Sequence, residues 1–314
     1  TLGPISGVVE RIGIEAEIDF PAGRDGTFGP VDADVGFSPP KGFGISIDAS
    51  AVTGEGYLSF DAENERYEGT LKLAFGDIVV NAVGLLTTRL PGGEDGFSLL
   101  IIISGEFPPI QLGMGVTLNA LGGLLGVNRT TQFDVLRSGL KKGSMKSVLF
   151  PEDPVRNAPQ LISDLRSIFP PMNDRHVIGP MARFAWGTPP IVTADVGILL
   201  ELPAPIRLAI LGRISAVLPA EEGALIELNM DALGVVDFGE GTASVDASLS
   251  DSRIVTLVIT GDMALRSSWG DNPGFGLSVG GFNPRFTPPP EFPDLRRLSL
   301  NLCPGNNPRL RLAG

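Results

Sequence analysis

Residues 69–89 read GTLKLAFGDIVVNAVGLLTTR, and this stretch decides the fold. Leu71, Leu73 and Phe75 alternate with polar or small residues, and the same two-residue period resumes after Gly76-Asp77. Such a period places alternate side chains on opposite faces of a sheet, and Gly-Asp between two such runs is typical of a tight turn. The stretch therefore predicts a β-hairpin with one apolar face.

Similar runs continue along most of the chain. Residues 242–251, TASVDASLSD, alternate most regularly, and Val245 and Leu249 share their apolar face. The uninterrupted apolar run at 99–103 indicates a strand buried on both faces. Further strands are predicted at 14–20, 43–50, 57–60, 112–118, 184–186, 191–202, 206–218, 224–230, 254–260, 274–280 and 298–302. The 41 glycines and 27 prolines also favour short strands joined by turns over a helical bundle.

The pattern changes between residues 120 and 176. We predict a flexible turn at 122–126 (GGLLG), a short helix at 134–140 and a second helix that begins after Asn157 and ends at Pro170-Pro171. Leu161, Ile162, Leu165 and Ile168 would form the apolar stripe of the second helix. We expect this stripe to pack on the sheet. The alternative is a detachable lid or a helix that binds a partner.

The chain divides into a first β-meander half (1–119), a helical and loop insert (120–176) and a second β-meander half (177–314), within one structural unit. Residues 56–89 and 234–266 resemble each other in length and in their Gly-led strand starts. We interpret them as two copies of one meander, although alternation and glycine turns are shared by many unrelated meanders. The predicted fold is mainly β, with antiparallel meanders in one curved sheet or two packed sheets and the helical segment packed against them.

Composition excludes several classes of partner. The formal net charge is −12, so nucleic acid and anionic membrane surfaces would be repelled. The single cysteine, Cys303, permits no internal disulfide, and no apolar run is long enough for a transmembrane segment. Both ends of the sequence are abrupt, which predicts a fragment of a longer chain. The compartment stays open between the cytoplasm and release with an assembly.

No catalytic or cofactor motif stands out. Ser278 lies in a G-x-S-x-G match, but the prolines that follow oppose the helix that a nucleophile elbow requires. His176, the only histidine, lies upstream, where a hydrolase of that type does not place it. One histidine and one cysteine nearly exclude a transition-metal site, and the loop carboxylates at 32–34 and 94–95 are interpreted as solvated. We therefore predict no enzyme, no metal and no cofactor.

Several phrases resemble a bacterial family that is defined only by a domain of unknown function. They are GLLTTRLPGGEDGFSLLIIISGEFPPIQLGMG, GGLLGVNRT, VLFPEDPVRNAPQLISDLRSIFPP and MALRSSWGDNPGFGLSVGGFNPRF. Members look like long Gly/Pro-rich β proteins, some of them near contractile injection systems related to phage tails. The resemblance implies a bacterial source, a longer parent chain and an assembly or delivery context, and it transfers no functional residue.

Two hypotheses for function follow. The first is a non-enzymatic structural or binding module whose partners are other segments of the parent chain or proteins of a bacterial assembly. The second is a carrier of lipid or another hydrophobic ligand. In the second, Leu71, Leu73, Phe75, Val245 and Leu249 would line an apolar groove; in the first, the same residues would form an ordinary core under a second layer.

Overall fold

The computed structural model describes residues 5–10, 13–19, 32–38, 42–49, 52–142, 144–203, 206–219, 224–269, 273–283, 285–301 and 311–313, and its described side chains lie almost entirely within 52–301. The strands are β1 (Ile5–Glu10), β2 (Gly13–Asp19), β3 (Asp32–Ser38), β4 (Gly42–Ala49), β5 (Val52–Asp61), β6 (Arg66–Phe75), β7 (Ile78–Arg89), β8 (Asp95–Gly113), β9 (Val116–Arg129), β10 (Pro171–Trp186), β11 (Val192–Leu202), β12 (Arg207–Leu218), β13 (Ile226–Asp237), β14 (Thr242–Leu249), β15 (Ser252–Ile254), β16 (Leu257–Thr260), β17 (Asp262–Ser268), β18 (Gly274–Val279), β19 (Ser299–Asn301) and β20 (Arg311–Ala313). The helices are α1 (Phe133–Gly139), η1 (Leu140–Lys142), η2 (Ser144–Ser147) and α2 (Ala158–Ile168).

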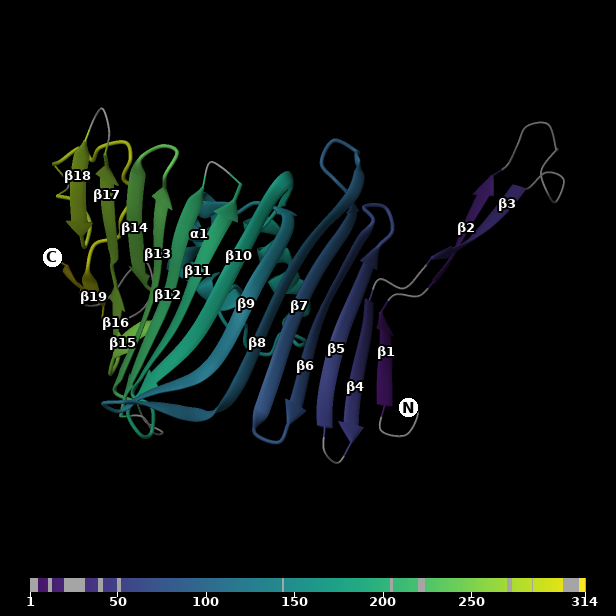
Figure 1. Cartoon of the computed structure of the whole chain (residues 1–314), viewed down its shortest axis with the longest axis horizontal. Helices are drawn as coiled ribbons and strands as arrows, with labels where there is room; N and C mark the ends of the chain where they lie inside the picture. The colour runs from purple at the N-terminus through teal and green to yellow at the C-terminus, as the bar shows by residue number, and fades with distance from the viewer. Residues whose placement is uncertain are drawn as a thin grey trace.

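One antiparallel sheet of 18 strands organises the molecule. Neighbouring strands pair in the order β1, β4 to β14, β17, β18, while β15, β16, β19 and β20 extend it at one corner. β2 and β3 pair separately as a hairpin. The helices α1, η1, η2 and α2, which we call the helical segment, lie behind the sheet in the view of Figure 1. The predicted mainly β, antiparallel fold with helices against the sheet is thus confirmed, and it takes the single-sheet form.

The hairpin of β6 and β7 forms as its pattern predicts. β6 and β7 pair in register from Arg66 opposite Thr87 to Phe75 opposite Ile78. Gly76 adopts φ +59°, a left-handed conformation that glycine reaches without steric cost. The tight turn therefore follows from local chemistry alone.

The helical segment connects β9 to β10, which pair with each other along most of their length. In α2, residues Leu161, Ile162, Leu165 and Ile168 are all buried, as the predicted stripe requires. Their partners are the buried side chains of one sheet face, such as Leu85. The core therefore lies between that face and the helical segment. None of the helices in the described part of the chain is long and apolar enough to cross a membrane.

Four expectations from the sequence were wrong. Residues 112–118 and 254–260 are not single strands, because the turns at 114–115 and 255–256 interrupt them. Residues 122–126 are not a flexible turn but the middle of β9, paired on both sides with β8 and β10. Residues 173–176, at the end of the predicted helical and loop insert, belong to β10.

The run at 99–103 is buried on one face only. Leu100 and Ile102 are 0% and 1% exposed, whereas Ile103 is 50% exposed. The apolar run predicts burial on both faces, but the helical segment covers only one of them. The uncovered face of the sheet is therefore the feature to examine for function.

Candidate functional site

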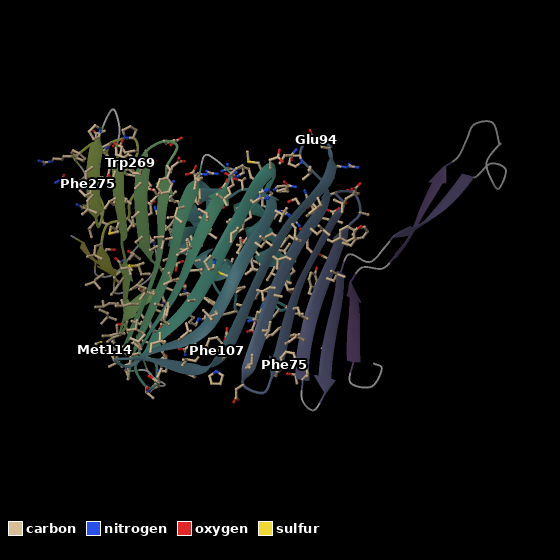
Figure 2. All side chains as sticks on the ribbon, in the orientation of Figure 1. Phe75, Glu94, Phe107, Met114, Trp269 and Phe275 are labelled. Carbon is tan, nitrogen blue, oxygen red and sulfur yellow. The ribbon has the colours of Figure 1, made fainter. Side chains whose placement is uncertain are left out.

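The two faces of the sheet differ sharply in burial. On β7, Val83 and Leu85 point toward the helical segment and are 2% and 1% exposed. Ile78, whose side chain lies on the opposite face of the same strand, is 47% exposed. We call the face under the helical segment the covered face and the opposite one the open face. In Figure 2 the open face is toward the reader, with Phe75, Phe107 and Met114 along its lower rim.

The open face is apolar from β5 to β18. The register aligns one row of residues across these strands, none of which carries a polar or charged side chain: Gly56, Leu71, Ala82, Ile103, Gly123, Pro180, Ile198, Ile210, Gly234, Val245, Leu265 and Leu277. At the usual strand spacing of about 4.8 Å, the row is about 50 Å long. An exposed apolar surface of this extent marks an interaction site in a soluble protein.

The residues predicted to line a groove all lie on the open face. Leu71 and Phe75 on β6 are 40% and 43% exposed, and Leu73 lies between them on the same face. Val245 and Leu249 on β14 share that face through their pairing with Gly234 and Met230. The two groups are separated by the strands from β7 to β13, about 38 Å at the usual strand spacing. The structure therefore places all five on one surface, at two distant parts of it.

A hollow lies near the middle of the open face, over β8, β9 and β10. Its volume is about 790 Å³. Gly123 and Pro180 line it together with Ile103, Leu121 and Ile178, which have 50%, 51% and 46% of their surface exposed. Sequence reasoning missed this site because it assigned 122–126 to a turn, and no polar residue in this segment marks a strand alternation.

Carboxylates of the covered face are paired with cations, several of which come from the helical segment. Arg166 of α2 reaches Glu68 at 2.6 Å, Arg137 of α1 reaches Asp246 at 2.7 Å, and Lys141 approaches Asp262 at 3.5 Å. Alternating acids on a strand ordinarily indicate a solvated face. Here these acids are 3–8% exposed by side chain, so they lie under the helical segment, on the face that also carries the core.

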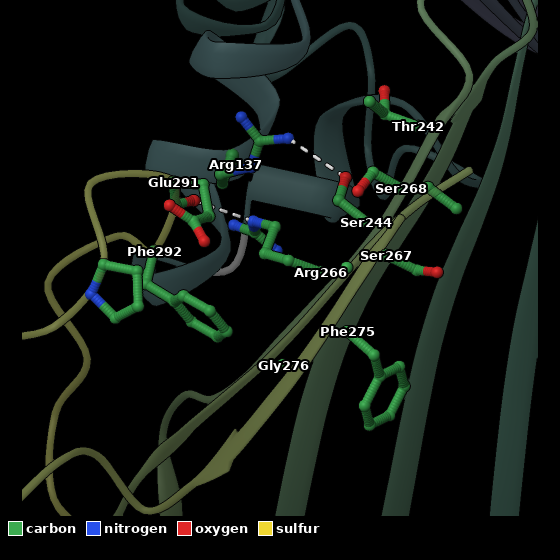
Figure 3. Close-up of a pocket in the computed structure, with 13 residues that line it drawn as sticks. Arg137, Thr242, Ser244, Arg266, Ser267, Ser268, Phe275, Gly276, Glu291 and Phe292 are labelled. Carbon is green, nitrogen blue, oxygen red and sulfur yellow. Dashed lines mark hydrogen bonds between the residues drawn. The ribbon is translucent and has the colours of Figure 1, made fainter. Parts of the chain in front are cut away.

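A second, polar pocket lies at the end of α1 (Figure 3). It has a volume of about 590 Å³ and is lined in part by Arg137, Ser244, Arg266, Glu291 and Phe292. Both guanidinium groups donate to the carboxylate of Asp246, at 2.7 Å each. Arg137 also donates to the Ser244 hydroxyl, and Arg266 to the backbone oxygen of Glu291. These arginines join α1 and the 289–292 segment to the sheet.

Burial raises the pKa of the covered-face residue Asp231 to about 6, against weaker opposing effects of Arg213 and of the hydrogen bond from the Met145 N–H. An unfolded chain would give this carboxyl a pKa of about 3.9. Because the folded state binds the proton more tightly, ionised Asp231 costs stability above pH 6, and that cost disappears as the pH falls.

We expect Asp231→Asn to raise the free energy of unfolding at pH 7 by about 1–3 kcal/mol. Urea denaturation of both proteins between pH 7 and pH 5 measures this difference. The wild type should gain stability relative to the variant as the pH falls. Parallel pH profiles would show that Asp231 does not carry the cost.

The other residues considered from the sequence form no catalytic arrangement. Ser278 is 6% exposed on β18, and His176 on β10 accepts a hydrogen bond at Nδ1 from the N–H of Asn128 on β9. Six strand spacings, about 29 Å, separate β10 from β18. Glu94 accepts a hydrogen bond from Asn173, while Cys303 and the side chains of 32–34 lie outside the described part. Among the described side chains, no group of three or more His, Cys, Asp or Glu is arranged to hold a metal ion.

Comparisons with known proteins place the chain by its sequence alone. Neither the curated proteins nor the solved structures include a match. One family model, however, matches residues 1–314, the whole length of the sequence. The chain therefore belongs to DUF6603, a family of unknown function.

Proposed function

We propose that this chain is a non-enzymatic binding module whose binding surface is the open face. The observation that carries the proposal is the row from Gly56 to Leu277, which crosses the sheet without a polar side chain. Burying apolar surface is worth about 25 cal/mol per Å², so leaving this face in water is unfavourable. Its partner therefore presents an apolar surface.

The resemblance noted in the sequence supports a setting for this module. It favours a larger bacterial protein or assembly, including one associated with a contractile injection system. The carrier hypothesis is the second candidate, and the observation that favours it is the hollow over Gly123.

The fluorescence of the dye bis-ANS, which brightens on apolar protein surface, tests whether the open face binds. We expect the wild type to bind it strongly and Ile103→Glu to reduce the fluorescence several-fold, because a carboxylate placed on apolar surface must keep its water. Ser163→Glu adds the same charge on the exposed side of α2 and should leave dye binding unchanged.

Size-exclusion chromatography with light scattering should accompany the dye titration, since an open apolar face also promotes association of copies. If Ile103→Glu changes neither dye binding nor the mass in solution, the open face is not the binding surface.

A further inference from the structure

The hollow over Gly123 has the size of a ligand site. The hollow is a shallow depression that opens to solvent along the sheet surface, and its volume of about 790 Å³ falls within the range of about 300–1,000 Å³ that is common for small-ligand sites. Its walls are the half-exposed side chains of Ile103, Leu121, Leu125 and Ile178. Such walls present methyl and methylene groups to an occupant and nothing else.

The hollow offers almost no hydrogen bonds. No side chain around it carries a donor or acceptor, and the backbone of β9 is already paired with β8 on one side and β10 on the other. Pro180 has no N–H at all. A buried polar group without a partner costs about 1–3 kcal/mol, so a sugar, a nucleotide or an extended peptide would bind here at a loss. An occupant without polar groups has no such cost.

The surroundings of the hollow favour a long, flexible occupant over a second copy of the chain. The apolar row continues from the hollow to Leu71 on one side and to Ile198 on the other, which suits a chain that extends beyond the hollow. A second copy packed about a twofold axis through the hollow would set one hollow against another, and the void would forfeit packing contacts. It would also bring together two chains of net charge −12.

We propose that the hollow over Gly123 binds the hydrocarbon chain of a lipid, lying across β8, β9 and β10 on the open face. The proposal rests on the proposed function and assigns the class of ligand. A free fatty acid and the acyl chain of a phospholipid share this chemistry. Their head groups lie outside the hollow and do not enter the argument.

Filling the hollow tests the proposal. A Cβ at Gly123 would find its nearest atom, the Gly179 carbonyl oxygen, at 3.6 Å, so Gly123→Leu fits without displacing backbone. Gly212 lies on the same face outside the hollow, and a Cβ there would meet the Ala232 Cβ at 3.9 Å. Gly212→Leu is therefore the matched control. Thermal melts of both variants establish that they fold.

The probe is cis-parinaric acid, titrated by fluorescence into the full chain. We expect Gly123→Leu to weaken binding by about tenfold, equal to about 1.4 kcal/mol, while Gly212→Leu stays close to the wild type. Ile178→Gln, which places a polar group in the wall, should weaken binding as well. Competition by palmitate and by vesicles of zwitterionic phosphatidylcholine then distinguishes a free fatty acid from a phospholipid source.

Two results would overturn the proposal: wild-type affinity in Gly123→Leu, or no binding of cis-parinaric acid by the wild type. If the wild type binds no fatty acid but Ile103→Glu still reduces dye binding or association, the hydrocarbon occupant is rejected and the binding module stands. If Ile103→Glu also has no effect, both proposals fail.

Discussion

Replacing Glu201 by alanine should lower the free energy of unfolding by about 3–5 kcal/mol, because two arginines whose side chains are only 11% and 26% exposed lose their counter-charge. Glu201 is 1% exposed and accepts hydrogen bonds from Arg175 at 2.7 Å and Arg207 at 2.6 Å. The Thr130 hydroxyl and the Thr131 N–H, which lie where β9 leads into the helical segment, donate to the same carboxylate. One side chain thus joins three strands to the start of the helical segment.

The pH dependence of this stabilisation follows from the pKa of Glu201. Burial alone would raise the pKa of Glu201, but hydrogen bonds from Thr130, Arg207 and Arg175 outweigh burial and hold that pKa below its usual value. The stabilisation is therefore present at neutral pH and is lost in acid, as the pH falls through the folded-state pKa.

Urea denaturation followed by circular dichroism measures the effect of Glu201→Ala. The matched control is Glu227→Ala, which breaks an exposed ion pair. The side chains of Glu227 and Arg253 in this pair are 31% and 49% exposed. An exposed pair contributes about 0–1 kcal/mol, so this variant should be nearly neutral. Equal losses of unfolding free energy in the two variants would show that burial does not determine how much the Glu201 cluster stabilises the fold.

Leu165→Ala should cost about 2–5 kcal/mol, the range for removing a fully buried leucine side chain and leaving a cavity. Leu165 is 0% exposed at the centre of the α2 stripe and belongs to the core shared with the covered face. The control is Ser163→Ala on the exposed side of the same helix, which should change stability by less than about 0.5 kcal/mol.

The same experiment decides between a helix that is part of the core and a detachable lid. If α2 belongs to the core, the whole sheet loses stability in Leu165→Ala, and the far-UV and near-UV transitions shift together. If α2 detaches on its own, the far-UV transition of the sheet will have the same urea midpoint in the variant as in the wild type.

Local chemistry determined much of the fold directly. The alternation in 69–89 and the glycine of the Gly76-Asp77 turn fix the β6–β7 hairpin, since both signals act between residues that are neighbours in sequence. The stripe from Leu161 to Ile168 likewise fixed α2 and the side that it buries. Sequence also placed Leu71 and Val245 on apolar faces, which the register then joins in one row.

The sequence was less informative where the side chains on both faces of a strand are apolar. Residues 122–126 combine three glycines with two leucines, so no polar residue marks the alternation of β9. Pairing with β8 and β10 makes this segment a strand, and the paired residues are far apart in sequence, from Gly122 with Ser104 at 18 positions to Gly122 with Met181 at 59. The hollow is therefore invisible without the register.

Which face of the sheet is covered was decided by tertiary structure alone. Period-two alternation separates apolar from polar side chains but does not say which set faces a second layer. Here Arg166 meets Glu68 across 98 positions of sequence and Arg137 meets Asp246 across 109. These long-range ion pairs hold the helical segment over the set that carries both the acids and the buried core residues such as Leu85, and they leave the other, apolar set exposed as the open face.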